Sequence, residues 1–126
     1  MDIRTFKDLK VWKKSYDLAV EVYKATKLFP SEEKFGITSQ IRRAVVGISS
    51  NIAEGYARGY LKQYIQFLYV AYSSGAELET QLMLAKDFGY LTKERFDGLM
   101  ERYYEVERML KGLINSLERK IVYKNP

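Results

Sequence analysis

Apolar side chains recur every three or four residues through most of this chain, which is the period of a helix packed on one side. In the first segment, this stripe consists of Leu9, Trp12, Tyr16, Ala19, Tyr23 and Thr26, widened by Val11, Leu18 and Val22. Pro30 follows and cannot continue a helix. We therefore predict a first helix over about residues 7–28, with this stripe in the core.

The next two segments show the same spacing. Ser31 is a candidate N-cap before two acidic residues, and Gly36 separates that turn from a second helix over about residues 37–58. Its core stripe is Ile37, Ile41, Ala44, Val45, Ile48 and Ile52. A third helix is predicted over about residues 60–88. Gly59 and Gly89 stand where helices commonly end in a left-handed glycine.

The last segment has the clearest boundary signals. Thr92 is a good N-cap, and Leu91 and Phe96 fit a hydrophobic staple around it. Apolar residues then continue at helical spacing as far as Leu117. The pattern predicts a fourth helix over about residues 92–121.

No segment has the alternation of a strand with a partner. Four long helices joined by short connections predict an all-α, antiparallel up-down-up-down four-helix bundle. We expect residues 1–126 to form a single domain.

The second and third helices are unusually poor in charge on their outer sides. Opposite its core stripe, the second helix carries Val46, Ser49, Ala53 and Ala57, and residues 63–76 of the third helix are uncharged. A helix that is apolar on most sides is usually buried on most sides. We therefore predict a homo-oligomer with Val46, Ser49, Ala53 and Ala57 in its interface. The alternative is a surface that is merely poor in charge.

A polar stripe lies between these two faces of the second helix. Arg43 and Glu54 are too far apart on one helix to pair, so Glu77 is the expected partner of Arg43. Tyr64, or a basic side chain near the turn after Gly55, is the expected partner of Glu54. We predict a structural polar network of Arg43, Asn51, Glu54 and Glu77. A ligand pocket or a carboxylate pair is the functional alternative.

The chain has neither cysteine nor histidine. Their absence removes thiolate nucleophiles, the commonest general base and the commonest transition-metal ligand. Glu54 and Glu77, the only candidate acid pair in the low-charge zone, are expected near opposite ends of their helices. We predict no enzymatic activity, no catalytic residues, no metal, no cofactor and no small-molecule substrate.

The net charge of +5 arises in the first half of the chain. Antiparallel topology brings many basic residues to one end of the bundle, together with tyrosines that could stack on bases. We predict that this end binds RNA or DNA without sequence specificity. The predicted contacts are Lys7, Lys10, Lys13, Lys14, Arg58, Lys62, Arg119, Lys120 and Lys124. Ordinary solvated lysines and core tyrosines are the alternative.

The N-terminal residues lack the apolar core of a signal peptide. The longest uncharged run, residues 63–76, has 14 residues, and a membrane-spanning helix needs roughly 20. We therefore expect a cytoplasmic protein without a membrane partner.

Several short motifs occur in an order that resembles a known family. They are FKDLKVW at 6–12, TSQIRRA at 38–44, NIAEG at 51–55 and SSGAELET at 73–80. Together they resemble the bacterial 23S rRNA intervening-sequence proteins, an S23-like family of four-helix bundles. This resemblance implies a ring-like homopentamer, and it makes Arg43, Asn51, Glu54, Gly55 and Glu77 signature positions. A related group, the accessory proteins of diversity-generating retroelements, binds nucleic acid and a reverse transcriptase.

The resemblance implies no enzymatic activity. Two functions are therefore expected from the sequence. One is a homo-oligomer that contacts RNA or DNA through its basic end. The alternative is a protein–protein scaffold or accessory subunit without direct nucleic-acid contact.

Overall fold

The structure is a computed structural model that describes residues 2–124, with side chains described as far as Ile121. It contains four α-helices and two short 3-10 helices, and no strand in residues 2–124. The elements are η1 (Phe6–Asp8), α1 (Lys10–Thr26), η2 (Ser31–Glu33), α2 (Ile37–Arg58), α3 (Leu61–Asp87) and α4 (Lys93–Lys124). The predicted all-helical bundle is confirmed.

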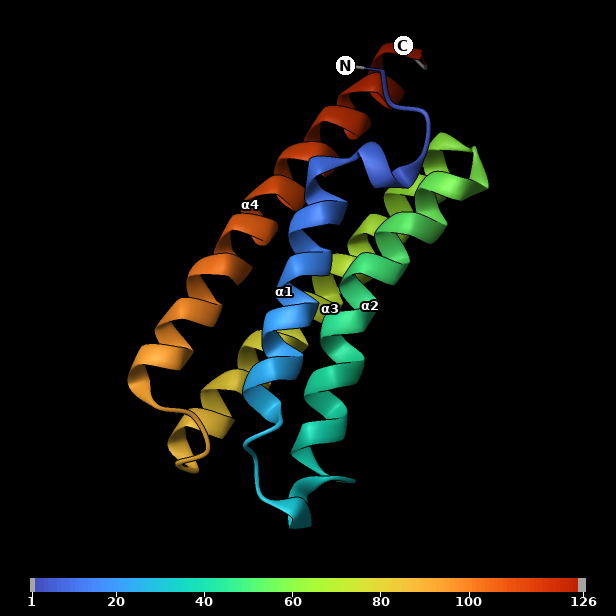
Figure 1. Cartoon of the computed structure of the whole chain (residues 1–126). Coiled ribbons are helices and arrows are strands. Elements are labelled where there is room, and N and C mark those ends of the chain that lie inside the picture. The colour runs from blue at the N-terminus through green and yellow to red at the C-terminus, as the bar shows by residue number, and fades with distance from the viewer. Residues whose placement is uncertain (1, 125–126) are drawn as a thin grey trace.

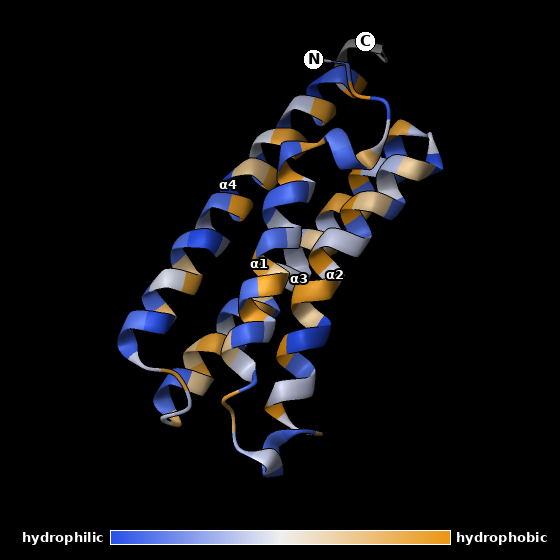
Figure 2. Ribbon diagram, in the orientation of Figure 1, coloured by the Kyte–Doolittle hydropathy of each residue, from blue (hydrophilic) through white to orange (hydrophobic). Residues whose placement is uncertain are grey.

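The four α-helices run alternately up and down, as the colours of Figure 1 show. η1, the α2–α3 turn and the end of α4 lie at one end of the bundle. The connections on either side of η2 and the α3–α4 turn lie at the other end. Figure 2 shows hydrophilic residues spread along the whole of α4, consistent with a helix that has one wet side.

The first helix is shorter than predicted at both ends. Thr5 and Asp8 form a reciprocal capping box around η1, and Leu9 is extended, with ψ 124°, before α1 begins. At the other end, the Thr26 hydroxyl donates to the Val22 carbonyl at 2.9 Å. The chain then leaves the helix, four residues before Pro30.

The other helix ends follow local capping rules. Gly59 and Gly89 have φ of 78° and 85°, the left-handed region that glycine adopts without strain. The Thr92 hydroxyl accepts from the Arg95 amide at 3.2 Å, as predicted for an N-cap. The prediction for Ser31 was wrong: it is the first residue of η2, and Pro30 occupies the N-cap position.

The core stripe of α1 is rotated from the predicted one. Val11, Leu18 and Val22 are buried, whereas Tyr16 and Tyr23 are exposed. Ser15 is fully buried, and its hydroxyl keeps a hydrogen bond by donating to the Trp12 carbonyl at 2.8 Å. The predicted stripe from Trp12 to Tyr23 therefore lies beside the core rather than in it. On α2, by contrast, the predicted stripe from Ile41 to Ile52 is buried.

Candidate interaction surfaces

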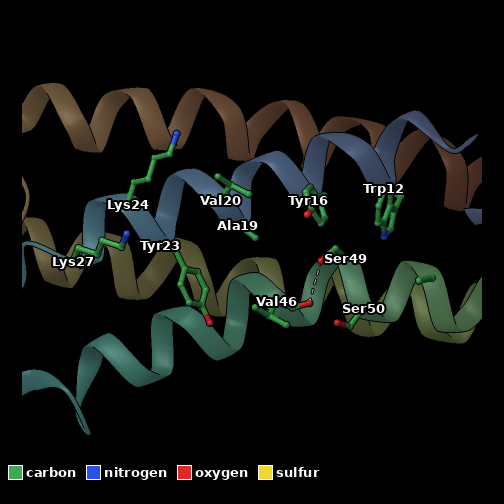
Figure 3. A pocket seen from close by; sticks show the side chains of 11 residues that line it. Trp12, Tyr16, Ala19, Val20, Tyr23, Lys24, Lys27, Val46, Ser49 and Ser50 are labelled. Carbon is green, nitrogen blue, oxygen red and sulfur yellow. Dashed lines mark hydrogen bonds between the residues drawn. The ribbon is translucent and has the colours of Figure 1, made fainter. Parts of the chain in front are cut away.

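An apolar groove with a volume of about 650 Å³ lies between α1 and α2. On the α1 side, Figure 3 shows Trp12 and Tyr23 extending towards α2, while Lys24 points away from it. Val46, Ser49 and Ser50 line the α2 side. We call this feature the α1–α2 groove. Its lining is mainly apolar, and its exposed aromatic rings are of the kind enriched in protein interfaces.

Three of the four residues predicted for the oligomer interface lie in this groove. They are Val46, Ser49 and Ala53, whereas Ala57 is exposed but is not part of its lining. The Ser49 hydroxyl donates to the Val46 carbonyl at 3.3 Å, so its polarity is largely satisfied within the helix. Sequence reasoning missed the α1 half of the groove because its aromatic residues were assigned to the core.

A second apolar surface lies on α3. Tyr69 and Val70 are exposed within the uncharged run of residues 63–76. Met83 and Leu84 are exposed about four helical turns further along α3. We call these four residues the α3 face. No Cα atom of α1 lies within 8 Å of a Cα atom of α3. The groove and the α3 face are therefore separate surfaces of one chain.

The four residues of the predicted polar network do not form one network within the single chain. Asn51 donates to the Gly47 carbonyl at 2.7 Å, and Glu54 pairs with Arg58 at 3.2 Å. Arg43 and Glu77 are both exposed, and the described ion pairs and side-chain hydrogen bonds include neither. The expected basic partner of Glu54 near the turn is thus found in Arg58, but the expected Arg43–Glu77 pair is not formed.

The predicted nucleic-acid contacts gather at the end of the bundle that holds both η1 and the α2–α3 turn. We call this the basic end. Three of these residues have acidic partners: Lys13 pairs with Asp17 at 3.2 Å, Lys14 with Glu105 at 3.1 Å, and Arg58 with Glu54. Exposed basic residues with no ion pair among the described side chains are Lys7, Lys10, Lys62, Arg119 and Lys120. The side chain of Lys124 lies outside the described residues.

The tyrosines at the basic end have different environments. Tyr60 is exposed, and the Tyr56 hydroxyl donates to the Ile3 carbonyl at 3.4 Å, which ties the N-terminal segment to α2. The Tyr64 hydroxyl is buried without a hydrogen-bond partner. Burial, with a smaller contribution from Tyr56, raises the pKa of Tyr64 to about 12. Only Tyr60 is therefore freely presented for stacking among these three.

We predict that Tyr64→Phe does not lower the free energy of unfolding at neutral pH, because the lost hydroxyl has no partner. Tyr64 has a folded-state pKa above its ordinary value of 10.0, so its neutral form contributes stability below pH 10 that is lost as pH rises towards 12. The variant should therefore show a shallower loss of stability over that range. Urea unfolding at several alkaline pH values measures this. A large loss of stability at neutral pH would contradict the assignment.

Within residues 2–124, no group of three or more acidic side chains is placed to hold a metal ion. Nor is any helix of that part of the chain long and apolar enough to cross a bilayer.

Comparisons with known proteins agree with this geometry. A family model described as the 23S rRNA-intervening sequence protein matches residues 7–112. The crystal structure of a protein with unknown function from the S23 ribosomal protein family of Bacteroides thetaiotaomicron is similar, with a TM-score of 0.78 and 27% sequence identity. The match covers 83% of this chain and 95% of that chain. A comparison with curated proteins finds no match. The chain belongs to the family of 23S rRNA-intervening sequence proteins.

Proposed function

We propose that this protein is a non-enzymatic homo-oligomer that binds RNA or DNA without sequence specificity through its basic end. The first part of this proposal rests on the apolar α1–α2 groove together with the exposed apolar side chains of the α3 face. The observation that supports the second is the gathering of basic side chains without ion pairs at one end of the bundle.

The proposed occupant of the groove is a second copy of the chain. The groove is an apolar concavity, and the α3 face presents exposed apolar side chains on a single helix that could enter it. Val46 on one surface and Val70 on the other are both exposed in isolation. A contact between two different surfaces of the same chain is heterologous, and it closes into a ring when the rotation between neighbours permits. Resemblance to the family suggests five copies.

A ring would repeat the basic end around its axis. Each copy would then add phosphate contacts to one multivalent surface, so weak single contacts would give useful binding. Neutralising phosphates releases counterions, and affinity should therefore fall steeply with salt. This binding mode needs neither a catalytic group nor a sequence-reading motif.

We predict that Lys10→Glu/Lys62→Glu weakens RNA binding by on the order of tenfold or more and lowers the salt slope, because two phosphate contacts per copy are lost. Fluorescence anisotropy of a labelled structured RNA at two salt concentrations measures this. Lys86→Glu/Lys93→Glu is the matched control, with the same charge change at the other end of the bundle. No binding of the unmodified protein at low salt, or equal loss in both variants, would refute the proposal.

A protein–protein scaffold is the second candidate, and the apolar groove favours it. A helix of another protein would fill the α1–α2 groove with the same kind of apolar contact. Under this alternative, the groove would remain free in a chain that does not self-associate. Retention of a partner after nuclease treatment, by a monomeric form of the chain, would favour the scaffold.

A further inference from the structure

Glu77 stands in the middle of an otherwise uncharged side of α3. It is exposed and takes part in none of the ion pairs among the described side chains. Val70 and Leu84 precede and follow it by one heptad each, and a helix returns to nearly the same side after a heptad. Glu79, the other acid of this stretch, accepts from Tyr104 of α4 at 2.8 Å. Glu77 is therefore an available carboxylate in line with two exposed apolar residues of the α3 face.

The α1–α2 groove has available cations on both of its walls. Lys27 lines the α1 wall, and Arg43 stands on α2 one helical turn before Val46. Both cations are exposed and absent from the described ion pairs. They lie at the same level, because their chain neighbours Thr26 and Arg42 are joined by a hydrogen bond of 2.9 Å. None of the described residues that line the groove is acidic, so this level favours an incoming carboxylate.

The groove continues past this level over the start of α2. A second hollow, of about 460 Å³, shares Tyr23 and Val46 with the groove and is also lined by Arg43 and Phe35. Phe35 is 90% exposed, the highest value among the exposed large apolar side chains of the described residues. Covering its ring removes a large apolar area from water. The groove and the hollow thus form one continuous surface, with the two cations between its apolar parts.

The spacings along the two surfaces match when neighbouring bundles point the same way along a ring axis. α1 and α3 both run away from the basic end, so positions along one can be compared with positions along the other. With Glu77 of one copy at the two cations of the next, Val70 lies one heptad nearer the basic end, level with Val20 of the groove. Leu84 lies one heptad further away, level with the start of α2, where Phe35 stands.

We propose that Glu77 of one copy binds between Lys27 and Arg43 of the next copy, and that the same contact covers Phe35. This inference rests on the proposed assembly through the α1–α2 groove, and it fixes the register of that contact. Arg43 and Glu77, which do not pair within one chain, pair between chains. The carboxylate selects the register, because a shift by one turn leaves it against apolar side chains, where an unpaired charge is unfavourable.

Charge reversal, followed by sedimentation velocity over a dilution series, tests the ion pair. Glu77→Lys should weaken assembly by at least about a hundredfold, because like charges then meet in the contact. Lys27→Glu/Arg43→Glu should do the same. The triple variant with all three reversals should regain assembly. An equimolar mixture of the two broken variants should co-assemble, because every contact between unlike chains then joins opposite charges. Glu101→Lys, at an exposed α4 position outside the described ion pairs, is the control and should assemble normally.

A separate substitution tests the cover over Phe35. Phe35→Ser should weaken assembly by about tenfold or more, the effect of leaving one aromatic side chain uncovered. In a Val46→Glu background, which is expected to be monomeric, it should leave the urea midpoint unchanged, because the ring already lies in water there. Unchanged assembly of Phe35→Ser would refute this part of the contact.

Failure of the ion pair can be told apart from failure of the proposed assembly. If Val46→Glu gives a monomer while Glu77→Lys assembles normally, the ion pair is refuted and the groove contact stands. The same holds if neither the triple variant nor the mixture regains assembly. A monomeric unmodified chain at micromolar concentration refutes both the assembly and the ion pair.

Discussion

Replacing Val46 with glutamate is expected to convert an oligomer into a folded monomer. Val46 is 40% exposed in the isolated chain, so a glutamate there meets water and the bundle can still fold. In the assembly the same carboxylate would be buried against an apolar surface, at a cost of on the order of several kcal/mol for an unpaired ion. Sedimentation velocity gives the mass, and circular dichroism reports the helix content. Gly112→Glu is the control, at an α4 position where an added Cβ meets no atom within 4 Å.

Mixing two variants that each fail to assemble tests whether the contact between copies joins two different surfaces of the chain. Val70→Glu should also give a monomer, because Val70 is the centre of the uncharged part of the α3 face. The Val46→Glu chain keeps an intact α3 face, and the Val70→Glu chain keeps an intact groove. An equimolar mixture should therefore form a heterodimer that grows no further. A mixture that stays monomeric would contradict a contact between the groove and the α3 face.

Gly55→Ala is expected to lower the free energy of unfolding by about 1–3 kcal/mol, the usual cost of overpacking. An added Cβ would lie 2.6 Å from the Phe67 Cβ and 3.2 Å from the Tyr64 carbonyl oxygen. Neither atom is the end of a flexible side chain, so α2 and α3 must move apart. Urea unfolding monitored by circular dichroism measures the change, at a protein concentration held fixed because assembly adds to apparent stability.

Gly112→Ala is the matched control for this substitution. The added methyl group meets no atom within 4 Å, and the position lies inside α4. Alanine should therefore stabilise this site by about 0.5–1 kcal/mol through helix propensity. Opposite signs for the two glycine substitutions are expected. Stabilisation by Gly55→Ala would contradict the close packing of α2 on α3.

The helices could be predicted because their ends are set by local chemistry. α2 spans Ile37–Arg58, as predicted, because Gly36 and Gly59 punctuate it and its β-branched stripe has a clear helical period. The residue at which α1 begins was harder to predict from the sequence. The Thr5–Asp8 capping box stabilises a separate 3-10 turn whose residues also suit an α-helix.

The predicted orientation of α1 about its axis was wrong, and the reason is physical. Trp12, Tyr16 and Tyr23 are large and partly polar, and a period analysis gives them more weight than the small residues beside them. Ser15 and Ala25 are buried in the core instead, because small side chains allow neighbouring helices to approach closely. The α1 half of the groove is therefore visible only once the helices are packed.

The ion pairs of α2 could not be predicted from the spacing of residues alone, because they depend on how exposed each side chain is. Antiparallel helices were expected to pair Arg43 with Glu77, but both side chains are exposed to water, where an ion pair contributes little to stability.

The molar mass of the unmodified protein at micromolar concentration tests the central claim most directly. Multi-angle light scattering on a size-exclusion column gives it without assumptions about shape. The proposal predicts a single species at an integral multiple of the 14.8 kDa chain mass, and five copies by resemblance to the family. A single peak at the mass of one chain would contradict the assembly through the α1–α2 groove.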